Sequence, residues 1–235
     1  MKKINTILAA VGALLMLSVT GANSVEFKAG VTANGMAAYA NAKETLKGSG
    51  VKTGRTTNEE AVLAASFASI FAEVSSDEMM GLGIGVSYAP EVADLAKETR
   101  HIANPNTADS GNDTDGGVQA VDAKINDLLS LYVTLPVGGN GAYVKAGYIQ
   151  ATMVTEESLA TGSKYENIDM TGTQIGGGYE GSLGDMAFWR AEGSYQMWED
   201  VSASGSEPDG DDSTKNKIEA EMGSVTGSLS IGMKF

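Results

Sequence analysis

The sequence predicts an all-β protein, a transmembrane antiparallel up-and-down β-barrel of eight strands that follows a cleaved signal peptide. Three observations predict this fold class. Apolar and polar residues alternate with a period of two along most of the chain, the connections between these segments are alternately short and long, and the chain opens with an apolar leader. Its 235 residues are compatible with one domain.

The first 24 residues have the layout of a secretory signal peptide. Two lysines precede an apolar run at residues 7–17, and the small residues 22–24 stand before the expected cleavage site. An uncleaved membrane anchor is the alternative, but the run has only about half of the roughly 20 residues that a spanning helix needs. We therefore expect residues 1–24 to be removed and residues 25–235 to form an outer-membrane β-barrel domain.

Charge and cysteine content exclude two classes of function. The formal net charge is -14, and loss of Lys2 and Lys3 with the leader makes it -16. Such an acidic surface repels a phosphate backbone, so we expect no nucleic-acid partner. The chain has no cysteine, which excludes a disulfide framework and thiol chemistry in an exported protein.

Period-two alternation predicts the strands. In MGLGIGVSY, residues 80–88, apolar side chains alternate with glycine and serine, and in DMAFWRAEGSYQMW, residues 185–198, they alternate with charged and polar groups. The faces of the second strand are ambiguous, because VLAASFASIFAEV is apolar on both sides, and those of the fifth are weakly defined. The eight predicted strands are residues 25–40, 58–75, 79–89, 120–136, 142–155, 167–181, 185–199 and 216–235.

The lengths of the connections indicate how these strands are joined. Connections after the second, fourth and sixth strands are short, whereas those after the first, third, fifth and seventh are long and polar. Short turns at one end and long loops at the other are typical of a transmembrane barrel. A closed sheet can span hydrocarbon because every backbone group is then paired internally. Within the long third connection, Val92, Leu95, Thr99 and Ile102 are spaced as on a short helix.

The signal sequence, the eight alternating segments, the short and long connections and the closing SLSIGMKF resemble the small Gram-negative outer-membrane barrels of the OmpA/OmpX type. The resemblance implies a cell outer membrane location, with lipid and lipopolysaccharide around the barrel. It also implies that Phe235 is an assembly signal read by the barrel assembly machinery. Because the sequence stops there, we expect none of the cell-wall anchoring that a following periplasmic domain provides in some relatives.

A soluble eight-stranded barrel of the lipocalin type is the structural alternative, with apolar residues inward around a ligand and charges outward. Alternation alone does not separate the two arrangements. The terminal phenylalanine, the Gly/Ser faces and the unequal loop lengths favour the membrane barrel.

Charged residues on the predicted inner faces are the candidate site. They can act as a gate or selectivity ring, or as a structural plug of ion pairs, and the narrow interior of an eight-stranded barrel favours the plug. These residues are Glu26, Lys28, Lys124, Lys145, Glu180, Arg190 and Glu192, together with Lys234.

The acidic loops are candidate ligands for Ca²⁺ or Mg²⁺, which prefer oxygen donors. The EF-hand spacing fails because Gly111 stands where the first aspartate is needed, and solvated loops are favoured, so we predict no metal site and no cofactor. The carboxylates concerned are Asp109, Asp113, Asp115, Asp209, Asp211 and Asp212.

Catalysis has little support in the sequence. His101 is the single histidine and lies in a predicted loop, and no GxSxG elbow or Cys/His cluster occurs. We predict a non-enzyme with a structural or surface-interaction role toward an unidentified surface ligand. A narrow passive channel is the runner-up, and a barrel enzyme is third. The predicted girdle at the two membrane interfaces consists of Trp189, Trp198, Tyr88, Tyr148 and Tyr179.

Overall fold

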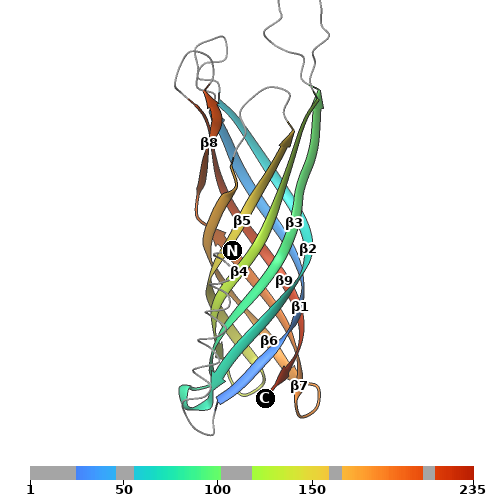
Figure 1. Ribbon diagram of the computed structural model, residues 1–235. Coiled ribbons are helices and arrows are strands. Elements are labelled where there is room, and N and C mark those ends of the chain that lie inside the picture. The colour runs from blue at the N-terminus through green and yellow to red at the C-terminus, as the bar shows by residue number, and fades with distance from the viewer. Residues whose placement is uncertain (1–24, 46–55, 102–117, 159–165, 209–214) are drawn as a thin grey trace, which may run out of the picture.

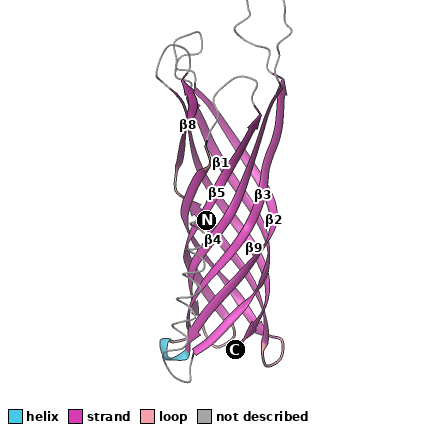
Figure 2. Cartoon of the chain, in the orientation of Figure 1, coloured by secondary structure: helices cyan, strands magenta, loops and turns pink. Residues whose placement is uncertain are grey.

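The computed structural model describes residues 25–45, 56–101, 118–158, 166–208 and 215–235. The predicted signal peptide lies outside these residues. Almost all of the described chain is extended, and a single helical turn, η1 (Asp77–Met79), lies in one connection (Figure 2). No helix in the described ranges is long and apolar enough to cross a membrane. The strands are β1 (Val25–Thr45), β2 (Thr56–Ser76), β3 (Leu82–His101), β4 (Val118–Pro136), β5 (Ala142–Ser158), β6 (Ile168–Ser182), β7 (Ala187–Trp198), β8 (Val201–Pro208) and β9 (Lys215–Lys234).

These strands form a closed antiparallel barrel, as the sequence predicts. Each strand from β1 to β7 pairs with the next one, β7 and β8 both pair with β9, and β9 pairs with β1. The segments β7 and β8 together make one barrel strand. From Met197 to Val201 the chain advances four residues while its partner on β9 advances three, so a one-residue bulge separates the two segments. The barrel therefore has eight strands.

The two ends of the barrel differ. Three short turns lie at the lower end in Figure 1, at residues 77–81, 137–141 and 183–186, and we call this the turn end. In the first turn Met80 and Gly81 have φ values of 60° and 76°, so the strand that was predicted to start at residue 79 begins at Leu82. The longer connections all leave from the opposite end, which we call the loop end.

An apolar belt surrounds the barrel near the turn end. On β9 the outward side chains from Val225 to Phe235 are apolar or glycine, and Leu229 is 66% exposed. At about 3.3 Å per residue and a tilt of about 40°, this stretch covers roughly 25 Å, the height of a lipid-facing belt. Other exposed members are Val31, Ile70, Leu131, Val133, Val144 and Ile175. A surface of this kind is stable in lipid rather than in water.

Above the belt the polarity of the wall is inverted. On β9 the outward residues become Glu221 and Glu219, while Met222 and Ala220 pack against the interior apolar cluster. On β1 the same change separates inward Asn34 from inward Met36. The eight residues 215–222 extend roughly 20 Å along the barrel axis beyond the belt, at the same rise and tilt. The barrel thus has a membrane tier and a projecting tier.

The wall also divides at this level. β2 and β3 pair with each other from Ser76–Leu82 to Ile70–Tyr88. Nearer the loop end this pairing stops, whereas β2 still pairs with β1 and β3 still pairs with β4. Figure 1 shows β3 and β4 rising to one side while β1, β2 and β8 rise to the other. The apolar cluster joins the two groups of strands, because it contains Met36 of β1, Val92 of β3 and Ile149 of β5. The projecting tier is therefore held by a core like that of two packed sheets.

The structure corrects one secondary-structure prediction. Residues 90–101 form the upper part of β3, not a helix, and Lys97 pairs with Asp122 of β4. Pairing with a neighbouring strand satisfies the backbone over this length and overrides the helical spacing of three or four apolar side chains. Pro90 is tolerated here because, among the described residues, β3 has no pairing partner on its β2 side beyond Tyr88.

Candidate functional site: a charged cluster in the lumen

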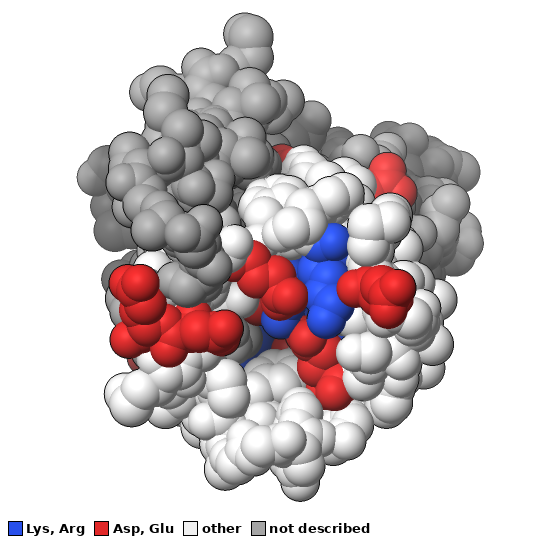
Figure 3. Space-filling view, turned by 90° about the horizontal axis from the view of Figure 1, so that it is seen from below, with Lys and Arg blue, Asp and Glu red and all other residues white. Residues whose placement is uncertain are grey.

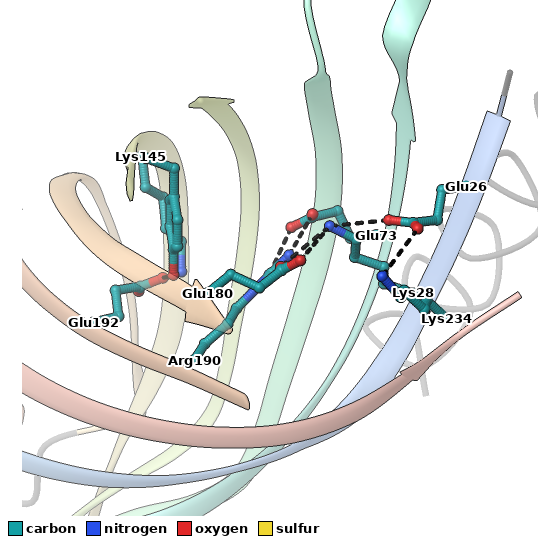
Figure 4. A network of polar contacts seen from close by, with 9 residues as sticks. Glu26, Lys28, Glu73, Lys145, Glu180, Arg190, Glu192 and Lys234 are labelled. Atoms are coloured by element: carbon teal, nitrogen blue, oxygen red, sulfur yellow. Dashed lines mark hydrogen bonds and ion pairs between the residues drawn. The ribbon is translucent and has the colours of Figure 1, made fainter. Parts of the chain in front are cut away.

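A cluster of charged side chains fills the interior of the membrane tier. Three of its contacts join strands that are not hydrogen-bonded neighbours and therefore cross the lumen: Arg190–Glu73, Lys28–Glu180 and Lys145–Glu192 (Figure 4). The contact between Arg190 and Glu180 instead joins directly opposed residues of the paired strands β6 and β7. Seen from the turn end, the lysine and arginine side chains lie at the middle of the barrel with carboxylates around them (Figure 3). The cluster, which we call the plug, consists of Glu26, Lys28, Glu73, Lys145, Glu180, Arg190, Glu192 and Lys234.

Arg190 of β7 is the centre of the plug. Its Nη1 and Nη2 atoms donate to the two carboxylate oxygens of Glu73 at 2.9 and 2.6 Å, and its Nε atom donates to Glu180 at 2.7 Å. Glu73 on β2 is 1% exposed, and Arg190 is 6% exposed. Arg190 and Glu73 thus form a bidentate ion pair in which hydrogen bonds replace the lost water around both charges. This is the condition for a stable buried ion pair.

Lys28 of β1 extends the network toward the turn end. Its Nζ atom lies 2.9 and 3.1 Å from the two oxygens of Glu180, so this carboxylate is shared between Lys28 and Arg190. Lys28 is also 3.2 Å from Glu26, which in turn lies 3.8 Å from Lys234. The charges form a chain from the dry centre to the more exposed rim.

A second pair stands higher in the lumen. Lys145 of β5 donates to Glu192 of β7 at 2.7 Å, and the hydroxyl of Tyr143 donates to the other oxygen of Glu192 at 2.9 Å. The ammonium group of Lys145 also lies 4.2 Å from the ring centre of Tyr132. Hydrogen bonds and an aromatic face therefore replace part of the water that Lys145 loses.

Aromatic rings close the space around Arg190. Its guanidinium carbon lies 5.2 Å from the ring centre of Phe188 and 5.4 Å from those of Phe71 and Tyr143. Phe188 has no exposed surface. Glycine provides the room for such rings, since a Cβ atom at Gly85 would overlap the ring of Tyr132. The plug is thus a packed core in which charges are embedded among rings.

A layer of neutral polar side chains lies above the plug. Asn34 donates to Ser69 at 3.0 Å and accepts from Ser228 at 2.8 Å, so it links three strands. Similar pairs join Gln174 to Ser130 and Ser224 to Gln196. Next along the lumen comes the apolar cluster of the projecting tier. Its buried members are Met36, Ala89, Val92, Ile125, Leu128, Ile149, Ala151, Met170 and Val201.

The structure brings together six of the seven predicted lumen charges, and Lys234 with them. Lys124 is the exception, because an irregular register between Asn126 and Leu129 shifts the alternation of β4. Its neighbour Ile125 is buried in the apolar cluster, so alternation directs Lys124 to the opposite face of the strand. Sequence reasoning missed Glu73, since the faces of its strand were undecided. Phe71 and Glu73 are buried, which settles that these residues point inward.

Aromatic residues predicted for the girdle do not all lie there. Tyr148 and Tyr179 are nearly half exposed on the belt, and Trp189 packs against Tyr179 with ring centres 5.7 Å apart. Trp198 instead packs against the apolar cluster inside the barrel, so its assignment to the girdle was wrong. It lies on the same face of the strand as Arg190, eight residues away.

Residues considered for metal binding or catalysis lie mostly elsewhere. The six aspartates of the acidic loops fall outside the described residues. His101 is the last residue of β3, and its backbone pairs with Val118. Among the residues that the structure describes, no group of three or more His, Cys, Asp or Glu side chains is arranged to hold a metal ion.

Phe235 closes the ring of strands at the turn end. Its backbone exchanges two hydrogen bonds with Phe27 of β1, of 2.9 and 3.2 Å, and the two aromatic rings lie 6.1 Å apart. The Phe235 side chain is exposed at the lower edge of the apolar belt.

A solved structure shares this fold. The outer membrane protein OprG from Pseudomonas aeruginosa matches with a TM-score of 0.50 and 14% identity, over 92% of this chain and 98% of that one. Lower-scoring matches are the outer membrane protease OmpT from Escherichia coli and Neisserial surface protein A. OmpT has a TM-score of 0.45 and 12% identity, over 89% of this chain and 97% of its own. The Neisserial protein has a TM-score of 0.39 and 11% identity, over 87% and 97%.

No protein-family model and no curated protein sequence matches this chain. Identities this low show likeness of fold alone. The closed eight-stranded barrel and its exposed apolar belt identify the protein as an integral outer-membrane β-barrel.

Proposed function

We propose that this protein is a closed barrel that performs a structural or surface-interaction role at the cell surface and conducts no solute. The turn end faces the periplasm and the loop end faces the exterior, as short turns and long loops are arranged in barrels of this kind. The observation that carries the proposal is the two-tier wall, in which a packed apolar core supports a polar surface beyond the membrane.

The plug supports the closed lumen. It joins four cations to four carboxylates, so it carries no net charge that would attract ions of one sign. A selectivity ring, in contrast, presents an excess of one charge to a water-filled path. Arg190 and Glu73 are almost completely buried, and the apolar cluster lies between them and the loop end.

The projecting tier supports the surface role. Its outer wall carries Asn41, Lys43, Glu60, Glu219 and Glu221, which are exposed polar or charged groups. A barrel that only had to span the membrane would need about 9 to 11 residues per strand, whereas β1 and β2 have 21 residues each. The extra length carries the loop ends of these strands away from the membrane, toward a ligand or partner at the surface.

The proposal names two further partners. Lipid and lipopolysaccharide surround the belt. The barrel assembly machinery reads Phe235, whose exposed ring stands at the seam between the first and last strands. No catalytic step is assigned to any residue. A narrow passive channel is the alternative function, and it requires that the plug open.

Site-directed labelling tests the two-tier arrangement, because the natural chain has no cysteine. Single cysteines would be placed at Lys43 in the projecting tier, at Ile231 in the belt and at Asp185 in a turn. In intact cells a membrane-impermeant maleimide should label the Lys43→Cys variant. The Asp185→Cys variant should react only after the outer membrane is permeabilised, and Ile231→Cys should stay protected in both cases. Labelling of Asp185→Cys but not Lys43→Cys in intact cells would reverse the orientation and end the surface proposal.

A further inference from the structure

A small cavity lies between the plug and the apolar cluster. Its volume is about 40 Å³. Lys145 and Glu192 border it on the plug side, and Phe67, Leu128 and Ile149 border it on the other. The rest of its wall is mainly serine, asparagine and glutamine from the neutral polar layer, so the cavity is polar although it is deep in the barrel.

Thr226 of β9 lines this cavity and has an unusual hydroxyl group. Thr226 is 6% exposed, and its Oγ1 atom has no hydrogen-bond partner among the described residues. The comparable hydroxyl of Thr32 on the adjacent strand is bonded to Ser230 at 2.9 Å. A buried hydroxyl that lacks a partner destabilises the folded state, so the Thr226 position calls for a ligand with hydrogen-bonding capacity.

We propose that this cavity is a hydration site, in which a cluster of buried water molecules binds Thr226 Oγ1 and hydrates the inner side of the Lys145–Glu192 pair. A buried water needs about 10 to 15 Å³ of such space and two to four polar partners, so the cavity has room for about three or four. Its polar wall supplies the partners, and the apolar side chains above prevent the water from continuing toward the loop end.

The site divides the plug into a wet and a dry part. The Lys145–Glu192 pair borders the cavity, whereas the Arg190–Glu73 pair is enclosed by the rings of Phe188, Phe71 and Tyr143. The water therefore lies against one ion pair only and forms no continuous path through the lumen.

The test compares two isosteric variants, Thr226→Val and Thr32→Val, in urea titrations of the folded protein in lipid bilayers. Thr32→Val removes a hydrogen bond and should lower the urea midpoint. If water binds Thr226, then Thr226→Val also removes a hydrogen bond and should lower the midpoint to a similar extent. If the hydroxyl is dry, its removal relieves an unsatisfied group, and a midpoint equal to or above that of the parent would overturn the proposal.

A second measurement on the unmodified protein does not depend on the folding of a variant. Solution NMR in lipid nanodiscs should show rotating-frame Overhauser transfer from water to the γ-methyl group of Thr226. It should show none at the ε-methyl group of Met36, which lies in the apolar cluster. Absence of transfer at Thr226 would contradict the hydration site, and transfer at both positions would contradict the dry layer above it.

Discussion

Replacement of Arg190 by methionine tests whether the plug is a stabilising core. The substitution removes both hydrogen bonds to Glu73 and one to Glu180. Glu180 keeps its contact with Lys28, but Glu73 becomes a buried carboxylate that has lost its cation. Leaving such a charge uncompensated costs about 3 to 5 kcal/mol of the free energy of unfolding.

Removal of both partners should cost less than removal of Arg190 alone. In the double variant Arg190→Met, Glu73→Met, no charge is left unpaired between these two positions, and methionine fills the space among the aromatic rings. Replacement of a buried ion pair by apolar residues is often neutral or even stabilising. We therefore expect the double variant to recover most of the stability that the single Arg190→Met variant loses.

Urea unfolding in phospholipid bilayers provides the assay, followed by far-ultraviolet circular dichroism and by the gel shift between unheated and heated samples. Trp189 is adjacent to Arg190, so tryptophan fluorescence would mix local and global change. A loss below about 1 kcal/mol for Arg190→Met would show that water reaches Glu73 and that the pair is not dry. A double variant whose loss equals the sum of the two single losses would show that the residues do not act as a pair.

Three further predictions concern the wall. Gly85→Ala should destabilise the folded barrel by about 1 to 3 kcal/mol because the added Cβ atom overlaps the ring of Tyr132, whereas Gly35→Ala, whose Cβ atom meets open space, should not. Equal urea midpoints for the two variants would show that the lumen is loosely packed. Ile231→Arg, within the belt, should lower the free energy of unfolding by about 2 to 4 kcal/mol, whereas Glu221→Arg, on the same face above the belt, should lower it by less than about 1 kcal/mol. Similar losses for the two variants would show that the membrane boundary does not lie between these positions. Phe235→Ala should reduce the amount of heat-modifiable barrel in the outer membrane without reducing export, and unchanged levels would remove its role as an assembly signal.

Period-two alternation and the alternately short and long connections together predicted the barrel. Alternation was insufficient for β2, whose segment VLAASFASIFAEV is apolar on both faces. The two-tier wall explains this ambiguity. Phe67 packs against the apolar cluster inside, and Ile70 lies outside in the belt, so one strand carries apolar residues on opposite faces at neighbouring heights.

The soluble-barrel alternative therefore describes the projecting tier, although not the membrane tier. In the projecting tier apolar residues do face inward and charges do face outward, as in a water-soluble barrel. The strands pass from one solvent into another, and a pattern averaged over a whole strand hides the change. The inversion on β9 between Met222 and Ser224 could have been found by examining the two halves of each strand separately.

Charge balance could have improved the predicted site. The predicted inner faces carried five cations but three carboxylates, an arrangement that is unstable in a narrow lumen. Moving Lys124 outward and Glu73 inward gives four of each. Glu73 is the lone carboxylate in the apolar stretch of β2, so its isolation was a usable signal. The bulge near Asp127 that displaces Lys124 was not predictable from alternation, because it depends on pairing with β3 and β5.

The measurement that tests the closed barrel most directly is the conductance of the refolded, unmodified protein in a planar lipid bilayer. With a neutral plug at one level and a packed apolar cluster at another, we predict no steady conductance above the bare bilayer over the usual range of voltages. A well-defined conductance that is stable with voltage would contradict the closed lumen. It would instead make the charges around Arg190 the lining of a channel.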